Sequence, residues 1–358
     1  MKRKNEGFVT GKFQNEESEM KNLNILETGP LHPGETAFWK RHVMKFAVIG
    51  AGGVGGYFGA RLMESGHEVS FMARGAQLEA LRSKGLSLKS IQGDYQSAKL
   101  GAFENPAEIG EVDAVLVAVK AWQVPEVAPK LLPLAKGNTF FVPLQNGVEA
   151  AGQLISVLGE KRVLYGLCGL IAYVEEPGVV RHSGADPFIT FGEADGSSSS
   201  RASGLLTAFE NCHGVTAKQS SRIGEAIWEK FLLISAFSGV GGVTRMPMGV
   251  LRSVPDTRKL LDDTLREAVA VACARGLALG EATVEKTWKF YNALPPESTA
   301  SMQRDLMNGQ PSELESQTGA VVRIGSEMGA PTPINRFIYQ TLLPSELRAR
   351  GQVMVPEN

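Results

Sequence analysis

One glycine-rich turn constrains the fold of this chain more than any other part of its sequence. It lies within KFAVIGAGGVGGYFGARLMESGHEVSFMARG, residues 45–75. The apolar run at 46–49 predicts a buried strand, and the apolar spacing over 54–64 predicts a helix that Gly66 ends. Residues 68–73 predict a second strand. The stretch is therefore a β-α-β unit.

The glycines of this turn follow the spacing G-x-G-x-x-G at Gly50, Gly52 and Gly55. In a β-α-β unit the first glycine makes the turn, the second admits a pyrophosphate, and the third lets the helix pack on the strand. Free N–H groups and the dipole at the helix start favour the anion. An ordinary glycine turn is the alternative in a chain with 40 glycines, but the flanking strands and helix favour a dinucleotide site.

The end of the second strand indicates which dinucleotide binds. An acidic residue at this position would bind the ribose 2′-hydroxyl of NAD, whereas this chain has Arg74, whose guanidinium suits a 2′-phosphate. A solvated surface arginine is the alternative. We therefore expect NADP(H) as the cofactor.

Later segments continue the alternation of strands and helices that a doubly wound parallel sheet requires. Residues 113–120 and 138–147 each predict a buried strand, and these strands end near Lys120 and Asn146. Ligands of such sheets gather at the carboxyl ends of the strands, so both residues are candidate cofactor-binding residues. A surface lysine and a turn-forming asparagine are the alternatives.

Two apolar stretches between 163 and 193 predict paired strands that complete this sheet. His182 lies in the second stretch. A lone histidine is more often a hydrogen-bonded structural residue than a catalyst, so the sequence favours a structural role.

Beyond residue 220 the sequence has helical periodicity without strand alternation. The fold class is thus α/β: a Rossmann-type N-terminal dinucleotide-binding domain at 44–220, followed by an all-helical C-terminal domain at 221–350. We place the boundary within 217–223, where polar residues cluster. A cleft between two such domains is the usual place for a substrate.

Residues 1–43 are polar and of mixed charge, and predict a disordered extension. Because Met44 directly precedes the first strand, a start codon assigned too far upstream is the alternative.

Charge and cysteine content exclude several classes of protein. The net charge of −1 favours neither nucleic acid nor an anionic membrane as a partner. The three cysteines lie far apart without the spacing of metal ligands, which suits a reducing cytoplasm, and no metal is expected. The apolar runs are shorter than the roughly 18 residues of a membrane span.

Six motifs in order give the chain a resemblance to a known family. AVIGAGGVGGYFGARL, VKAWQV, PLQNGVE, WEKF, TASMQRDL and PSELESQTGAVVRIGSEMGAPTPIN together resemble ketopantoate reductase, the 2-dehydropantoate 2-reductase family. The resemblance covers about residues 45–349.

The resemblance implies NADPH-dependent reduction of 2-dehydropantoate to (R)-pantoate, on the route to pantothenate and coenzyme A, by a monomer or homodimer. It implies that Lys230 is the catalytic acid and that Glu313 orients the 2-oxo acid. It also matches the family's binding residues to Lys120, Asn146 and Ser301.

Elementary chemistry agrees with these two main roles. A desolvated lysine can stabilise and protonate the oxygen of a carbonyl under reduction, and Lys230 lies beside apolar residues. On spacing alone, a snorkelling helix lysine is the favoured alternative. For Glu313 the alternative is an acidic residue at a helix start after Pro311.

The chain departs from its family one and two turns after Lys230. Ketopantoate reductases usually have asparagines at these positions, where this chain has Ile234 and Ser238. We expect Ser238 to contact the substrate over a shorter reach, and Ile234 to weaken ketopantoate binding or favour a more apolar 2-oxo acid. Ser235 could compensate only if the helix were rotated. A non-catalytic NADP(H)-binding protein is a third hypothesis, disfavoured by Lys230 and Glu313.

Overall fold

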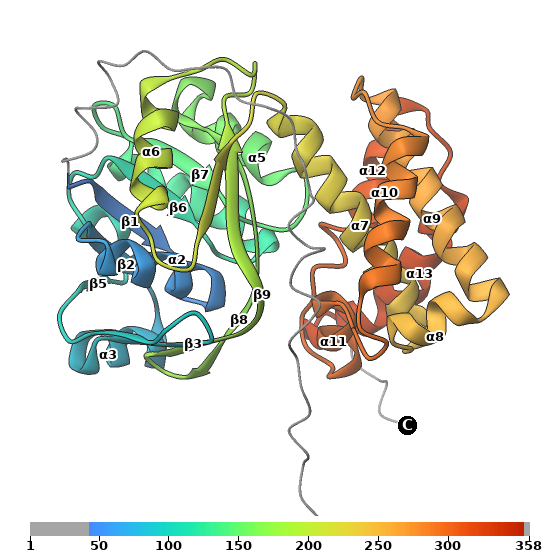
Figure 1. Ribbon diagram of the computed structural model, residues 1–358, viewed down its shortest axis with the longest axis horizontal. Coiled ribbons are helices and arrows are strands. Elements are labelled where there is room, and N and C mark those ends of the chain that lie inside the picture. The colour runs from blue at the N-terminus through green and yellow to red at the C-terminus, as the bar shows by residue number, and fades with distance from the viewer. Residues whose placement is uncertain (1–42, 354–358) are drawn as a thin grey trace, which may run out of the picture. The chain divides into compact units, whose positions relative to one another are not determined.

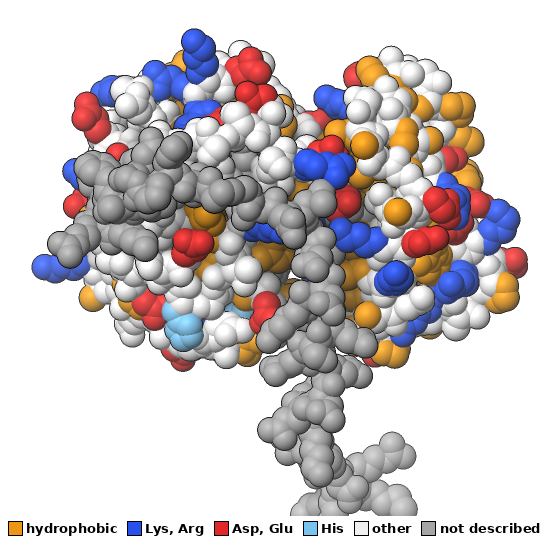
Figure 2. Space-filling view, turned by 45° about the horizontal axis from the view of Figure 1, so that its top comes forward, with side chains coloured by type: hydrophobic (Ala, Val, Ile, Leu, Met, Phe, Trp, Pro, Cys, Tyr) orange, Lys and Arg blue, Asp and Glu red, His pale blue; other side chains and the backbone are white. Residues whose placement is uncertain are grey.

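The structure is a computed structural model that describes residues 43–353 (Figure 1). Residues 1–42 of the predicted extension lie outside the described part. Lys and Arg side chains and Asp and Glu side chains are mixed over the face shown in Figure 2, in keeping with the net charge of −1.

The first sheet is parallel throughout and has the strand order β5-β2-β1-β6-β7. Its strands are β1 (Lys45–Ile49), β2 (Glu68–Met72), β5 (Gly101–Phe103), β6 (Ala114–Val117) and β7 (Phe140–Pro143). Strands β1, β6 and β7 are apolar and buried almost throughout, as strands covered on both faces must be. The predicted Rossmann-type sheet is confirmed. The order reverses beside β1, the point at which such sheets bind ligands.

Helix α2 (Gly53–Glu64) follows β1 and is covered on two sides. Gly55 and Gly59 face the first sheet, where an added methyl group would overlap atoms of the β1 turn and of β2. Gly53 and Gly56 face β8 and β9, where a methyl group would overlap those strands. The run of glycines thus allows one helix to pack closely between two sheets.

The second sheet corrects a prediction. Residues 163–193 do form paired strands, β8 (Tyr165–Glu176) and β9 (Val179–Gly192), but they do not complete the first sheet. The edge of β9 that β8 leaves free pairs in parallel with β3 (Leu86–Ser90) along residues 179–182 and with β10 (Thr216–Gln219) along residues 188–191, and β4 (Tyr95–Ser97) pairs with β3. A single bridge between Phe141 and Val163 leads from the first sheet into this second one.

Short helices connect the strands. They are η2 (Pro106–Glu108), η3 (Ala121–Gln123), α3 (Gly75–Lys84), α4 (Val124–Val127), η4 (Ala128–Leu134), α5 (Ala150–Leu158), η5 (Glu160–Arg162) and α6 (Ser200–Glu210). Apolar residues of α4, η4 and α5 form one core with β1, β6 and β7. Those of α2 and α6 form another core with both sheets. The parallel sheet is therefore covered on both faces.

The rest of the described chain is helical. It comprises α7 (Ile223–Thr244), α8 (Met248–Ser253), α9 (Pro255–Ala274), α10 (Glu281–Ala293), α11 (Ser301–Met307), α12 (Thr318–Met328) and α13 (Pro333–Ala349). These helices share one apolar core. Among the described residues, α7 alone is long and apolar enough to cross a membrane, but 67% of its most apolar window is buried within the protein. It is packed as a core helix.

The structure also changes the setting of Glu313. The sequence predicts a helix from about this residue, but α12 begins at Thr318 and Glu313 lies in the turn before it. The interpretation of Glu313 as a residue of a helix start is therefore wrong. The residue is 6% exposed, and its carboxylate accepts from other side chains instead.

Candidate functional site

The glycine turn has the geometry that the sequence predicts for a dinucleotide site. Gly50 has φ +101°, a conformation that residues with a side chain rarely adopt. A methyl group at Gly55 would overlap the carbonyl oxygen of Gly50. At Gly52, by contrast, no described atom lies within 4 Å of where a methyl group would be. Open space over Gly52, at the start of α2, fits the close approach of a pyrophosphate.

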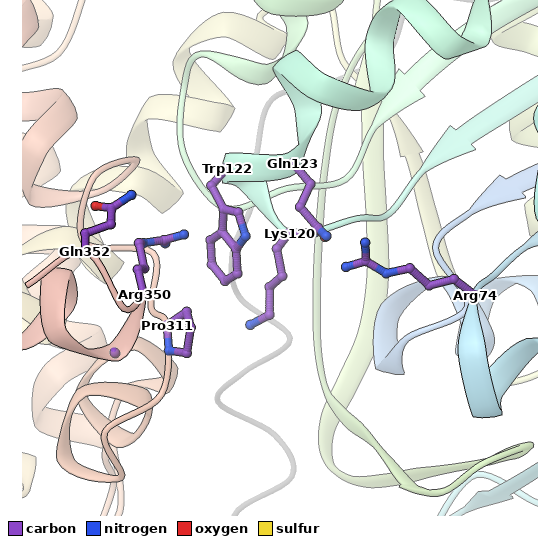
Figure 3. A pocket seen from close by; sticks show the side chains of 8 residues that line it. Arg74, Lys120, Trp122, Gln123, Pro311, Arg350 and Gln352 are labelled. Atoms are coloured by element: carbon purple, nitrogen blue, oxygen red, sulfur yellow. The ribbon is translucent and has the colours of Figure 1, made fainter.

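An open pocket of about 610 Å³ lies at the carboxyl ends of two strands of the parallel sheet (Figure 3). Arg74 follows β2 and Lys120 follows β6, and both line the pocket. Figure 3 shows the Arg74 side chain pointing toward Lys120. Both residues are exposed. Two cations at the carboxyl ends of β2 and β6, the strands on either side of β1, suit a phosphate group in this pocket.

The opposite wall of the pocket comes from the end of α13. The guanidinium of Arg350 lies 4.6 Å from the ring centre of Trp122, and Lys120 lies 5.6 Å from the same ring. Lys120 also forms an ion pair of 3.7 Å with Asp305 of α11. Burial raises the pKa of Asp305, and Lys120 opposes this effect. These contacts join the strand ends of the parallel sheet to the helices at the end of the chain.

Lys230 contacts the end of the sheet with its amine. Nζ donates to Oδ1 of Asn146 over 2.8 Å and to the carbonyl oxygen of Cys168. Burial lowers the pKa of Lys230 below its ordinary value of 10.5, while Cys168 and Glu313 act in the opposite direction. Burial raises the pKa of the Cys168 thiol to about 11. Lys230 is therefore a desolvated amine that two acceptors hold in place.

Glu313 completes the cluster around Asn146. Its Oε2 accepts from Nδ2 of Asn146 at 3.3 Å and from Nε2 of Gln317 at 3.3 Å. Its Oε1 lies 3.5 Å from the backbone N–H of Ala121, in the turn after β6. Asn146 thus bridges the ammonium of Lys230 and the carboxylate of Glu313.

The residues four and eight positions after Lys230 on α7 have different surroundings. Ile234 is half-buried, whereas Ser238 is 1% exposed and its hydroxyl lies 2.6 Å from Oε1 of Gln317. Ser235 is also 1% exposed, and its hydroxyl donates back to the Leu232 carbonyl of the same helix. Ser238 is thus engaged by protein, and its contact with a substrate stays a prediction.

The structure brings Lys230, Asn146 and Glu313 together and places Arg74 and Lys120 in the neighbouring pocket. Ser301 is exposed at the start of α11, and no hydrogen bond among the described residues links it to that cluster. Its role also stays a prediction.

Sequence reasoning missed several members of the site. Gln317 lies within the last quoted motif, but the motif assigns it no role, and only its place four residues after Glu313 points to it. The carbonyl of Cys168 and the N–H of Ala121 are backbone groups, which a sequence pattern cannot assign.

His182 has the structural role that the sequence favours. It is 1% exposed, its Nδ1 lies 2.9 Å from the Ser90 hydroxyl, and its Nε2 faces the carbonyl oxygens of Gly184 and Ala185. These contacts tie β9 to β3 within the second sheet.

Both parts of the chain match models of one family. The model described as "Ketopantoate reductase PanE/ApbA" matches residues 46–196, and "Ketopantoate reductase PanE/ApbA C terminal" matches residues 222–346. The matched ranges include the glycine turn, Arg74, Lys120 and Asn146 in the first part, and Lys230 and Glu313 in the second.

Individual relatives agree with the family models. "Uncharacterized oxidoreductase YkpB" of Bacillus subtilis (strain 168) is 30% identical over 84% of this chain and 98% of its own. A 2-dehydropantoate 2-reductase of Mesorhizobium japonicum is 28% identical over 81% of this chain and 94% of its own. The crystal structure of a PanE/ApbA family ketopantoate reductase from Ralstonia eutropha JMP134 is 29% identical, with a TM-score of 0.78 over 86% of this chain and all of that one.

Proposed function

Because the chain belongs to the ketopantoate reductase family, we propose that it reduces a 2-oxo acid with NADPH, and that 2-dehydropantoate is the first substrate to test. The product is then (R)-pantoate, a precursor of pantothenate and coenzyme A. Family membership supports an oxidoreductase, and the arrangement of the site supports the finer assignment.

The observation that carries this proposal is the position of the Lys230 ammonium. An ammonium has three N–H donors. Among the described residues two of them are used, by Asn146 Oδ1 and by the Cys168 carbonyl. The third is left for a substrate oxygen.

The residues of the first sheet fit NADPH. The turn at Gly50 and the open space over Gly52 suit the pyrophosphate, and Arg74 suits the 2′-phosphate. Lys120 lines the same pocket and adds a second positive charge. The bound nicotinamide supplies the hydride for the carbonyl carbon.

The protein's contribution to the chemistry lies with Lys230. As the carbonyl carbon is reduced, negative charge builds on its oxygen, and Nζ of Lys230 gives a proton to that oxygen. Because burial lowers the pKa of Lys230, the proton is released more readily than from an exposed lysine. Asn146 fixes the amine, and Glu313 accepts a hydrogen bond from a hydroxyl of the substrate. The neutral amine recovers its proton from solvent.

A second candidate is the reduction of a more apolar 2-oxo acid, and Ile234 favours it. This residue follows Lys230 by four positions on α7 and so lies on the same helix face, one turn on. An isoleucine can pack against an alkyl chain but cannot donate to a carboxylate or a hydroxyl.

Steady-state oxidation of NADPH over a panel of 2-oxo acids tests the proposal. The panel contains 2-dehydropantoate, 2-oxoisovalerate and 2-oxoisocaproate. Lys230→Ala should lower turnover about a hundredfold or more while NADPH still binds. Lys259→Ala is the control, since Lys259 pairs with Asp263 on α9.

The outcomes separate the candidates. Preference for 2-dehydropantoate supports the first candidate, and preference for a branched alkyl 2-oxo acid supports the second. NADPH binding without oxidation by any member of the panel contradicts both. Near-normal turnover of Lys230→Ala would remove the proton-donor role.

A further inference from the structure

Two buried polar side chains, those of Ser238 and Gln317, contact each other, and Gln317 also contacts Glu313. The hydroxyl of Ser238 is 2.6 Å from Oε1 of Gln317, and Nε2 of Gln317 is 3.3 Å from Oε2 of Glu313. Ser238 and Gln317 are each 1% exposed. Buried polar groups cost stability unless they are hydrogen-bonded. The hydroxyl of Ser238 has two acceptors for its one proton, the carbonyl oxygen of Ile234 on its own helix and Oε1 of Gln317. Among the described residues, Oε1 of Gln317 has Ser238 as its one donor, so the amide of Gln317 depends on this contact.

The charges of Lys230 and Glu313 determine which atoms donate and which accept in the hydrogen bonds around Glu313. An ammonium can only donate, so Lys230 fixes Oδ1 of Asn146 as an acceptor and turns its Nδ2 toward Glu313. A carboxylate can only accept, so the amide nitrogen of Gln317 also faces Glu313. This leaves Oε1 of Gln317 facing Ser238, whose hydroxyl can donate to it. The orientation of the Gln317 amide is thus set from both of its ends.

The two oxygens of Glu313 are held unequally. Oε2 accepts from both Asn146 and Gln317, while Oε1 has only the longer contact of 3.5 Å with the backbone N–H of Ala121. A carboxylate clamped at one oxygen presents the other oxygen in a fixed direction. That direction is available for a donor on a bound molecule.

We propose that Gln317 and Ser238 are positioning residues of the 2-oxo acid reaction. Gln317 clamps Oε2 of Glu313, and Ser238 holds the Gln317 amide in the orientation that makes this clamp. Their effect on the substrate passes through Glu313, which keeps Oε1 directed at a hydroxyl of the substrate. The inference rests on the proposed function, because the substrate is a 2-oxo acid.

The pair has a competing explanation. Ser238 belongs to α7 and Gln317 precedes α12, so the contact could serve only to pack these helices together. A packing role changes stability but leaves the Michaelis constants of the folded enzyme alone. A positioning role changes KM for the 2-oxo acid and leaves KM for NADPH unchanged.

Kinetics of Gln317→Leu and Ser238→Ala separate the two roles. Loss of a hydrogen bond to a charged group should raise KM for the 2-oxo acid about tenfold in Gln317→Leu. Ser238→Ala should raise it less, Ser238→Thr should restore it, and the double variant should be no worse than Gln317→Leu. Ser238→Ala removes a single oxygen atom, so it supplies the comparison even where Gln317→Leu does not fold.

Two controls match these variants in burial and chemistry. Ser235 is a buried serine of the same helix that donates only to its own helix, so Ser235→Ala should leave both KM values unchanged. Gln303 is a buried glutamine that donates to the carbonyl of Met246. Gln303→Leu should lower Tm without changing KM for the 2-oxo acid.

The result that overturns the proposal is an unchanged KM for the 2-oxo acid in Gln317→Leu and Ser238→Ala, with a lowered Tm as in Gln303→Leu. If the wild type reduces no 2-oxo acid, the proposed function fails. The hydrogen bond from Gln317 to Glu313 is then tested through the Tm of the variants. Gln317→Leu should then lower Tm more in the wild type than in a Glu313→Leu background, because only the wild type leaves a buried carboxylate short of a donor. Equal decreases of Tm in the two backgrounds would show that Gln317 does not hold Glu313.

Discussion

The amide of Asn146 separates the two charges of the site: Lys230 Nζ lies 2.8 Å from its oxygen, and Glu313 Oε2 lies 3.3 Å from its nitrogen. The asparagine stands at the end of the parallel sheet, while the two charged residues come from the helical part. A neutral side chain that can both accept and donate is what this position requires. Neither an aspartate nor an alanine meets this requirement.

Asn146→Asp should change the pH dependence of the enzyme in a defined direction. The lowered pKa of Lys230 places loss of the proton donor below pH 10.5, so kcat of the wild type should fall as pH rises through that lowered pKa. A carboxylate beside Nζ favours the charged amine, so Asn146→Asp should move this fall to higher pH. The pH profile of kcat measures the shift. A fall at the same pH in both proteins would contradict the assignment to Lys230.

The same lysine should appear in the pH dependence of stability. Between its lowered pKa and 10.5 the unfolded chain binds the proton that the folded protein has lost, so the folded state gains stability as pH rises through this window. Relative to Lys230→Met, the wild type should therefore become more stable with rising pH. Urea unfolding of both proteins at several pH values measures the difference. A constant difference would indicate that the amine is not desolvated.

Replacing Arg74 should affect one cofactor only. Arg74→Ala should weaken NADPH binding and leave NADH binding little changed, because only the 2′-phosphate loses a partner. Fluorescence titration with both cofactors measures the two dissociation constants. Lys84→Ala provides the matched control. Arg74 directly precedes the first residue of α3, and Lys84 is an exposed cation at the last residue of that helix. Equal losses for the two cofactors would contradict the assignment to the phosphate.

Two glycines of the same turn should give opposite results. Gly52→Ala has open space for its methyl group and should keep the Tm of the wild type while weakening NADPH binding. Gly55→Ala places a methyl group against the carbonyl of Gly50 and should lower Tm strongly. Thermal unfolding and cofactor titration of both variants check this contrast. A stable Gly52→Ala with unchanged affinity would place the pyrophosphate elsewhere.

Ile234→Asn tests the choice of 2-oxo acid. An asparagine at this half-buried position of α7 supplies a donor and an acceptor where the wild type has neither. A new hydrogen bond to a charged group should raise kcat/KM for 2-dehydropantoate relative to 2-oxoisovalerate about tenfold. The ratio of the two kcat/KM values is the measurement. A ratio that falls instead would show that Ile234 does not weaken recognition of 2-dehydropantoate.

The sequence predicts the part of the fold that has local signals. The turn at Gly50, helix α2 and strands β1 and β2 follow from glycine spacing and apolar periodicity over about thirty residues, and the structure has all four. The assignment of β8 and β9 to the first sheet is wrong for a physical reason. Strand pairing depends on which distant edges remain free, and β9 is paired by β3, some ninety residues earlier.

The residues of the site also divide into those that the sequence predicts and those that only the structure reveals. Lys230 and Glu313 can be selected through the family motifs, but nothing in either motif indicates that Asn146 joins them. Gln317 illustrates the limit: its buried amide matters because Ser238 faces it from another helix, 79 positions earlier in the chain. Such contacts arise from tertiary packing, which local patterns do not encode.

Helix α2 is held on two sides by sheets that touch its glycines, so evolution has little freedom to remodel the turn before it. On the proposed function, a change of cofactor preference is expected at the exposed residues that follow β2 and β6, where substitutions leave the core untouched. Arg74 and Lys120 stand at those positions. The fold thus separates a glycine helix that leaves no room for side chains from exposed strand ends where a new side chain disturbs no packing.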